Sequence, residues 1–251
     1  MNLRYIILLI AFITNCITYA QQPGINPKNM SDCRTAQFKG NVATVHETIT
    51  AIDYSHRTIK LGDVMNSSKY YYNENGDITK EERYDGNGLL VQKTIYQYKD
   101  GLKSVSTTYD ASDIRTLQTL YANTADGFCA RLRCTDAIGV TISTSEISIK
   151  ENWTKQSEEF NDGEIVDSEW FYNAKGELIK TTSKGQGTNS ISTITLNKEG
   201  FPSKMVIKNN GTRTTYEYTY GSISPEGNWL EMIVYKDGTP IEKRERIITL
   251  R

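Results

Sequence analysis

The sequence predicts an all-β protein, an antiparallel meander of glycine-punctuated hairpin repeats that forms a curled or rolled sheet. Three observations carry this prediction. Glycines recur at short, nearly even intervals after residue 75, many of them directly after Asn or Asp. The runs between them alternate polar and apolar side chains, as half-buried strands do. Beyond the first twenty residues, no stretch sustains the period of a helix. We expect a dozen or more short strands.

The turns are marked by Asn-Gly and Asp-Gly pairs. A two-residue type I′ turn needs positive φ at both central positions, which Asn, Asp and Gly tolerate best. Such pairs between β-rich runs are a strong hairpin signal. They predict turns at residues 75–76, 87–88, 100–101, 126–127, 162–163, 210–211 and 237–238. The segment 111–123 lacks such a pair, and we expect a longer loop there.

The clearest strand is the run from Thr212 to Tyr220, which places Tyr216, Tyr218 and Tyr220 on one face. The other face carries Arg213 and Glu217 among threonines, and it is polar enough to be the wet one. Burial of the tyrosine face is therefore the favoured interpretation. The alternative is an aromatic platform for a sugar or a protein partner, with Trp153 in its polar setting as a further candidate contact.

The first twenty residues have the layout of a secretory signal peptide. Arg4 precedes the apolar run YIILLIAFI, and a small residue, Ala20, marks the expected cleavage point. Because the apolar run is too short for a membrane helix, we expect no transmembrane segment after cleavage. Cys16 leaves a second interpretation open, in which it becomes a lipidated first residue. Residues 21–38 form a loose N-terminal segment, and residues 39–251 form a single repeat β domain.

Charge and cysteine content narrow the function further. The net charge is −1, which gives no electrostatic basis for binding nucleic acid. The exported chain keeps Cys33, Cys129 and Cys134. The last two are expected in one extended strand, with Cα atoms about 16 Å apart at ~3.3 Å per residue, too far apart for a disulfide. No further Cys or His stands at zinc-ligand spacing, so we expect no metal and no cofactor.

A family resemblance appears over residues 70–109, YYYNENGDITKEERYDGNGLLVQKTIYQYKDGLKSVSTTY. This stretch resembles the tyrosine-aspartate (YD, Rhs-type) repeats of secreted and envelope proteins of Gram-negative bacteria. Residues 171–178, the Gly227-Asn228-Trp229 ending and the opening strand from Gly40 are similar to parts of the same pattern. The resemblance implies a repeat architecture and no particular activity. The chain has too few repeats to close the toxin-enclosing shell of the large Rhs proteins.

Candidate catalytic groups are few. The adjacent pairs Glu81-Glu82 and Glu158-Glu159 point to opposite faces if they lie in strands, and we interpret them as solvated. His46, Glu47 and Asp53 lack a nucleophile motif such as Gly-x-Ser-x-Gly. The sequence therefore favours a non-enzymatic secreted or cell-envelope module that binds an envelope glycan or protein, or acts as a scaffold. The alternative is a carbohydrate-active enzyme of the envelope or extracellular space.

Overall fold

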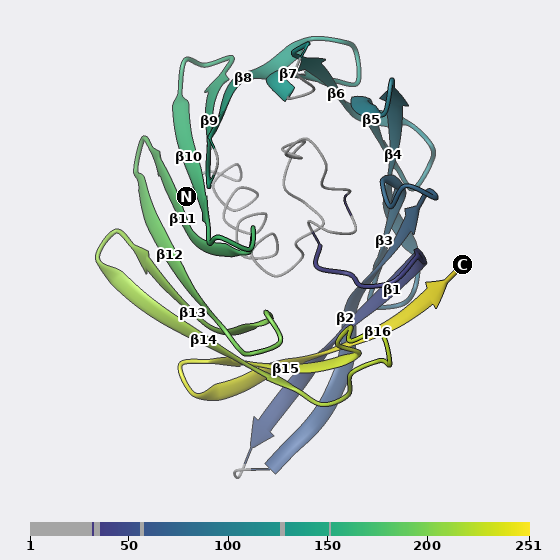
Figure 1. Ribbon diagram of the computed structural model, residues 1–251, viewed down its shortest axis with the longest axis vertical. Helices are drawn as coiled ribbons and strands as arrows, with labels where there is room; N and C mark the ends of the chain where they lie inside the picture. The colour runs from purple at the N-terminus through teal and green to yellow at the C-terminus, as the bar shows by residue number, and fades with distance from the viewer. Residues whose placement is uncertain (1–31, 33–35, 56–57, 126–128, 151) are drawn as a thin grey trace.

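The computed structural model describes Asp32 and residues 36–55, 58–125, 129–150 and 152–251, which form an antiparallel β-meander (Figure 1). The expected start of the exported chain at Gln21, Cys16, Cys33 and the 126–127 turn lie outside the described residues. The strands are β1 (Val42–Ser55), β2 (Thr58–Tyr72), β3 (Ile78–Asp85), β4 (Leu90–Lys99), β5 (Leu102–Asp110), β6 (Arg115–Asn123), β7 (Cys129–Asp136), β8 (Thr141–Lys150), β9 (Trp153–Phe160), β10 (Ile165–Tyr172), β11 (Leu178–Gly185), β12 (Thr188–Leu196), β13 (Pro202–Asn209), β14 (Thr212–Tyr220), β15 (Glu231–Lys236) and β16 (Thr239–Leu250).

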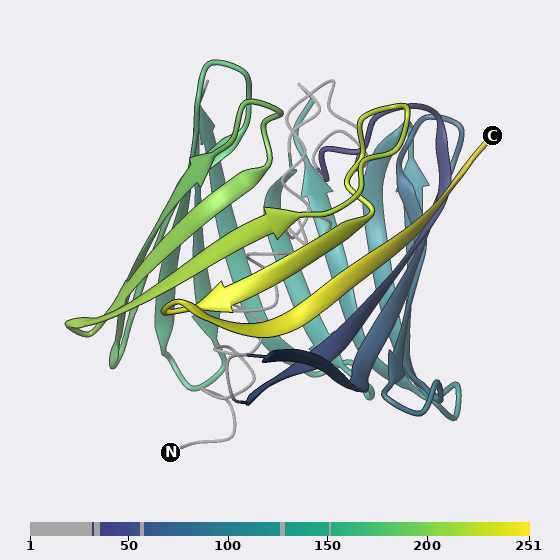
Figure 2. The same ribbon diagram turned by 90° about the horizontal axis from the view of Figure 1, so that it is seen from below.

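The sheet closes into a barrel, so the expectation of a curled or rolled sheet was wrong. β1 pairs with β16 as well as with β2, and each other strand pairs with its two sequence neighbours. The closing register runs from Val42 opposite Leu250 to Ala51 opposite Glu242. Figures 1 and 2 show the resulting ring of strands from one end and from the side. Hairpin signals in the sequence predict only the pairing of strands that are neighbours along the chain. They could not predict the pairing of β1 with β16, which joins the two ends of the domain.

Two kinds of turn connect the strands. Asp100-Gly101, Asn210-Gly211 and Asp237-Gly238 have positive φ at both residues, which confirms the type I′ prediction there. At Asn75-Gly76, Asn87-Gly88 and Asp162-Gly163 only the glycine has positive φ, so that prediction was wrong in detail. The longer turn at residues 73–77 is held by Asn73, whose Oδ1 accepts hydrogen bonds from the backbone N–H groups of Asn75 and Asp77.

The same side-chain arrangement recurs along the chain. Asp85, Asp110, Asp136, Asn173 and Asn197 each accept backbone N–H groups two and four residues ahead. The repeated sequence signal is therefore Asn or Asp three residues before the positive-φ position. At the turn after β5 that position is Asp113, with φ 62°. The expected long loop at 111–123 was thus wrong: a tight turn leads directly into β6.

Side chains alternate between the lumen and the outer surface. Residues of β11 to β15 and of the segments that connect them form the largest buried cluster, which includes Met205, Tyr216, Tyr218, Trp229 and Val234. A second cluster joins Phe38 to Val45, Tyr70 and Tyr72. On β7, Cys129 and Cys134 lie in one strand as predicted, and both are free thiols.

The first hairpin extends beyond the barrel, at the lower end of Figure 1. Beyond Ala51, toward the tip of the hairpin, the described part of β1 pairs only with β2. Likewise, the described residues of β2 that precede Asn66 pair only with β1. The cross-strand pairs Ile52–Leu61 and Tyr54–Ile59 share one face, and Leu61 is 58% exposed. The opposite face carries Asp53 across from Lys60. This extension is a two-sided ribbon with one apolar and one polar face.

The turn glycines give a stability prediction. Gly211 has φ +86°, and a β-branched residue held there should cost about 1–2 kcal/mol. We expect Gly211→Val to lower the melting temperature by roughly 2–4 °C per kcal/mol lost. Lys208→Val introduces the same side chain at an exposed strand position nearby and should have little effect. Equal melting temperatures for the two variants would contradict the hairpin geometry.

Candidate functional site

The lumen wall where β1 meets β16 carries a buried network of ion pairs. Glu47 lies between two arginines, with its Oε1 3.4 Å from Arg244 Nη1 and its Oε2 2.6 Å from Arg246 Nε. Arg244 also pairs with Glu242 at 2.6 Å. The Glu47 and Arg244 side chains are each 3% exposed. These charges stabilise the wall only as a set, because each alone would be buried without a partner.

A second polar cluster continues along β2, β3 and β4. Glu81 accepts a hydrogen bond from Arg83 Nε at 2.7 Å, and the Tyr96 hydroxyl lies 3.3 Å from its other oxygen. Tyr70 is buried nearby. Burial, together with the negative charges of Glu81 and Glu47, raises the pKa of Tyr70 above its usual value. Tyr70 therefore stays a neutral phenol at physiological pH.

An N-terminal strap, defined here as Asp32 and residues 36–40, lies against this wall. The Asp32 carboxylate accepts the backbone N–H of Ile78 at 2.9 Å and lies 2.8 Å from the Tyr98 hydroxyl. The backbone of Lys39 forms two hydrogen bonds with the Asn228 amide, at 2.7 and 2.9 Å. The strap is thus tied to the wall through Asp32 and Lys39.

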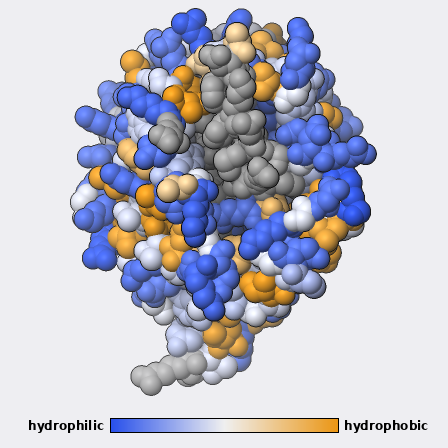
Figure 3. All heavy atoms as spheres, viewed as in Figure 1, coloured by the Kyte–Doolittle hydropathy of each residue, from blue (hydrophilic) through white to orange (hydrophobic). Residues whose placement is uncertain are grey.

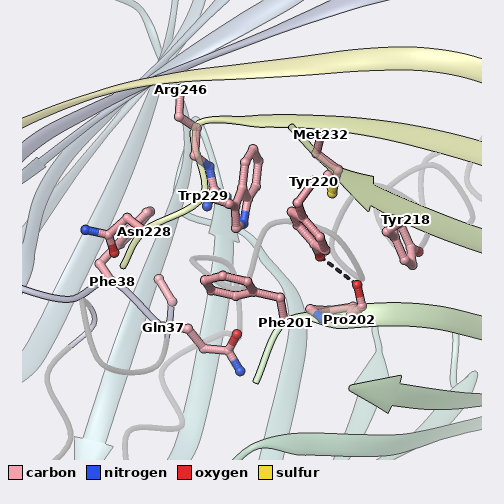
Figure 4. A pocket seen from close by; sticks show the side chains of 11 residues that line it. Gln37, Phe38, Phe201, Pro202, Tyr218, Tyr220, Asn228, Trp229, Met232 and Arg246 are labelled. Atoms are coloured by element: carbon pink, nitrogen blue, oxygen red, sulfur yellow. Dashed lines mark hydrogen bonds between the residues drawn. The ribbon is translucent and has the colours of Figure 1, made fainter. Parts of the chain in front are cut away.

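The strap and the ends of β13 to β16 enclose a small aromatic cavity (Figure 4). Its volume is about 20 Å³, room for a single water molecule. The Arg246 guanidinium lies 3.4 Å from the centre of the Trp229 ring and 5.0 Å from that of Phe38. The other lining residues are Ala36, Gln37, Phe201, Pro202, Tyr218, Tyr220, Asn228 and Met232. A cavity of this size seats the strap and has no room for an organic ligand.

The structure separates the residues that sequence analysis proposed for binding. Tyr216 and Tyr218 are buried in the main core cluster, as the favoured interpretation of that face predicts. Tyr220 is partly buried, and its hydroxyl donates to the carbonyl of Pro202 at 2.6 Å. Trp153 begins β9 on the outer surface, with the Lys150 ammonium 5.3 Å from its ring centre. The three tyrosines and Trp153 therefore form no common surface.

The proposed catalytic groups are likewise separated. Glu81 and Glu158 face the lumen and their neighbours Glu82 and Glu159 face outward, as strand alternation predicts. The interpretation that these glutamates are solvated was wrong for Glu81, which is 3% exposed. Sequence reasoning also missed the Glu47–Arg244–Arg246 network, because its members come from opposite ends of the domain. Among the described residues, no cluster of His, Cys, Asp or Glu is suited to hold a metal ion.

The other half of the lumen, from β8 to β13, is neutral and rich in hydroxyl groups. Its buried inward residues include Ser143, Ser145, Thr154, Thr181, Ser183, Ser190 and Ser192. Glu158 is the one acidic member among the described inward positions of β9, and it accepts a hydrogen bond from Ser143 at 2.6 Å. The lumen therefore offers one charged and one neutral polar wall.

The outer surface carries charge between its apolar residues. Ion pairs link Lys80 to Glu82, Lys155 to Asp167, Lys204 to Glu217, and Lys243 to both Glu231 and Glu245. Figure 3 shows hydrophilic side chains over much of the barrel end that bears the strap. A Lys or Arg facing hydrocarbon at the midplane of a bilayer costs about 2–4 kcal/mol. These pairs limit which parts of the outer wall can contact lipid.

Comparison with known proteins identifies the fold and no family. No family model matches the sequence, and no curated protein matches it. The chain is similar in structure to a porin-like protein from Bacteroides uniformis ATCC 8492, with TM-score 0.55 and 14% sequence identity over 84% of this chain and 98% of that one. A porin-like protein from Bacteroides vulgatus ATCC 8482 gives TM-score 0.40 and 10% identity over 81% and 97%.

These findings correct two expectations. The resemblance to YD or Rhs repeats was wrong: no family model supports it, and the hairpins close into a porin-like barrel. The expectation of no transmembrane segment after cleavage was also wrong, because it considered only helices as membrane-spanning elements. No helix among the described residues is long and apolar enough to cross a membrane. A closed barrel pairs all its strands, however, and is an architecture that can cross by strands.

The buried ion pairs give a second prediction. Glu47→Gln removes the charge that faces Arg244 and Arg246, so we expect a loss of about 3–5 kcal/mol in the free energy of unfolding. Glu217→Gln breaks a pair with Lys204 whose side chains are 44% and 48% exposed, and should cost less than about 1 kcal/mol. Urea unfolding measures both. Similar losses for the two variants would rule out a structural role for the buried network.

Glu158 gives a prediction about pH. Burial raises the pKa of its carboxyl, and the hydrogen bond from Ser143 opposes this only in part. A raised pKa in the folded state favours folding below the unfolded pKa of about 4.3, and that contribution is lost as the pH rises through the folded value. Glu158→Gln should therefore be more stable than the wild type at pH 7. We expect the difference to shrink toward pH 4 in urea unfolding, and a less stable variant at pH 7 would contradict it.

Proposed function

We propose that the protein is a non-enzymatic cell-envelope barrel that binds a ligand in its lumen. The observation that carries the proposal is that the buried acids of the inner wall are paired with arginines. Glu47, Glu81 and Glu242 each face an arginine, so these acids are committed to the wall. The hydroxyl-rich inner face of β8 to β13 is the other polar part of the wall.

The signal-peptide layout and the porin-like fold support placement in the envelope. We propose that cleavage after Ala20 releases the exported chain, with lipidation of Cys16 as the alternative. Residues 39–251 then form the barrel domain. The strap is held to the wall through Asp32 and through the hydrogen bonds between Lys39 and Asn228, and we propose the inner wall as the binding surface.

A carbohydrate-active enzyme is the second candidate, and one observation favours it. The raised pKa of Glu158 is a property of general acids. Glycoside hydrolysis needs a second carboxylate across the scissile bond. The inward position opposite Glu158 on β8 is Ser145, and on β10 it is Val166. The two adjacent strands therefore supply no partner acid.

The test is a thermal-shift screen of the exported protein against glycan, lipid and peptide fractions of the envelope, run beside assays for released reducing ends. We expect at least one fraction to raise the melting temperature, since a ligand at a hundred times its Kd adds about 2.7 kcal/mol. We expect no turnover. Polymer cleavage that Glu158→Gln abolishes would establish the enzyme instead, and no shift with any fraction would defeat the binding role.

A further inference from the structure

The turns at one end of the barrel carry exposed aliphatic side chains. In this meander the turns after the odd-numbered strands lie at one end, and the strap is tied to the other end through Ile78 and Asn228. Figure 2 shows the two ends as the lower and upper edges of the barrel. We call the turns after β3, β5, β7 and β9, residues 85–90, 110–115, 136–141 and 160–165, the apolar rim. Its aliphatic residues that are between 52% and 84% exposed are Leu89, Ile114, Ile138, Val140 and Ile165.

The geometry of these turns does not require an exposed aliphatic residue. At three turns of the rim, an Asp accepts the backbone N–H of the fourth residue ahead, and that residue is Leu89, Ile114 or Val140. The same hydrogen bond recurs at the strap end, where the turns begin with Asn. There the fourth residues are Asp77, Glu177 and Phe201, and Phe201 is buried in the main core cluster. A position that is acidic or buried at the strap end is therefore aliphatic and exposed at the rim.

The rim is a row of separate projections. Ile138 is 84% exposed, so most of its surface stands in water. From the first turn to the last, the row covers six strand spacings, roughly 29 Å along the wall at ~4.8 Å each. The first hairpin turns at the same end and adds the exposed Ile59 and Leu61. Exposed apolar surface of this extent marks an interaction site, and a row of single projections suits a broad, fluid partner.

The side chains behind the rim change in the order that a membrane interface favours. Tyr84 and Tyr109 lie on the outer face, one residue before the turns that follow β3 and β5. The Tyr84 hydroxyl donates to Glu82 at 2.8 Å, on the side away from the turn, and the Lys93 ammonium lies 5.5 Å from the ring centre of Tyr109. Aliphatic residues are thus followed by tyrosines and then by charges, which is the order found where proteins meet the lipid–water boundary.

Charge selects the kind of lipid. The one basic residue in the four turns is Arg115, whereas the acidic residues are Asp85, Asp110, Asp113, Asp136, Asp162 and Glu164. Only Asp113 among them has an ion pair on the outer wall, with Lys93. Like charges repel, so an anionic lipid surface is disfavoured. Phosphatidylcholine and phosphatidylethanolamine carry no net charge, and the cationic ammonium group at the end of their headgroups complements the carboxylates.

We propose that the apolar rim docks on a zwitterionic phospholipid surface, with Leu89, Ile114 and Ile138 entering the headgroup region. The inference goes beyond the proposed function, because the rim consists of turns at one end and the lumen wall takes no part in it. The turns after β11, β13 and β15 are polar, with Gln186-Gly187, Asn210-Gly211 and Asp237-Gly238 at their centres. The barrel therefore meets lipid along one side of this end, and the strap faces away from the lipid.

The test is vesicle flotation of the purified full-length exported protein. We expect it to bind vesicles of phosphatidylcholine and phosphatidylethanolamine, and to bind less when phosphatidylglycerol replaces part of that lipid. Leu89→Ser and Ile138→Ser should each lower the partition coefficient by about tenfold, since removing one aliphatic side chain from water favours binding by about that factor or more.

Ile247→Ser is the matched control, because Ile247 is 69% exposed and lies near the strap end of β16. This variant should bind vesicles as the wild type does. All three variants should melt at the temperature of the wild type, since the replaced side chains are exposed and contribute little to the fold.

The remaining outcomes each overturn the inference. If no vesicle binds the protein, the rim is not a lipid contact, and capture of an amphipathic Lys–Leu peptide that Ile138→Ser loses would assign the rim to a basic protein partner. If phosphatidylglycerol strengthens binding, the class of lipid is wrong. If Ile247→Ser weakens binding as much as the rim variants do, or if the rim variants bind as well as the wild type, the contact lies elsewhere on the outer wall. Ligand binding in the lumen is tested separately by the thermal-shift screen and survives any of these results.

Discussion

The hydrogen-bonded pairing of the first strand with the last is the constraint on which this structure depends. Without it, β1 and β16 would each present an unpaired edge, which is a template for aggregation. With it, sixteen short strands that could not stand alone share one ring. The inner and outer faces are then fixed for the whole chain, because a shift of one residue at this junction would exchange them.

Side chains hold this junction in register. Glu47 on β1 lies between Arg244 and Arg246 on β16; Glu47 and Arg244 are buried and Arg246 is partly buried. Arg251, which follows β16, donates hydrogen bonds to the carbonyl of Val42 on β1 and to the carbonyl of Tyr72 on β2. Buried ion pairs are weak evidence for net stability, and their best attested role is to select one register over others. Here the charges lie at the one junction that no hairpin turn specifies.

This explains which parts of the fold the sequence could predict. Strands, their alternation and most turn positions are local, and the burial of Tyr216 and Tyr218 followed from the pattern of nine residues. Closure is not local: Glu47 and Arg244 stand 197 residues apart, and neither has a motif. The prediction of a longer loop at residues 111–123 was wrong for a different reason. Asp113 takes the positive φ usually left to glycine, so a search for glycines passed over a turn that Asp110 marks clearly.

The residues of the candidate site likewise differ in how well the sequence could predict them. The tyrosine row of β14 attracted attention because aromatic residues are conspicuous in a sequence, yet most of it is core. The hydroxyl side of the inner wall is assembled from single serines and threonines on several strands, each of them ordinary in its own segment. Only the strand register reveals that these residues adjoin, as Thr181 and Ser192 do.

The fold and the surfaces carry separate information about function. A porin-like barrel describes how the backbone is paired, and that pairing is compatible with a wall in lipid or in water. The side chains decide between uses of the wall. On this chain the outer face bears Lys–Glu pairs such as Lys204–Glu217 and Lys80–Glu82, while the inner face is split into an arginine–carboxylate side and a hydroxyl side. Charge on the outside constrains contact with lipid, and on the inside Glu47, Glu81 and Glu242 are each paired with an arginine. The hydroxyl side is tied together by hydrogen bonds between neighbouring strands, such as those from Gln156 to Ser145 and from Ser143 to Glu158.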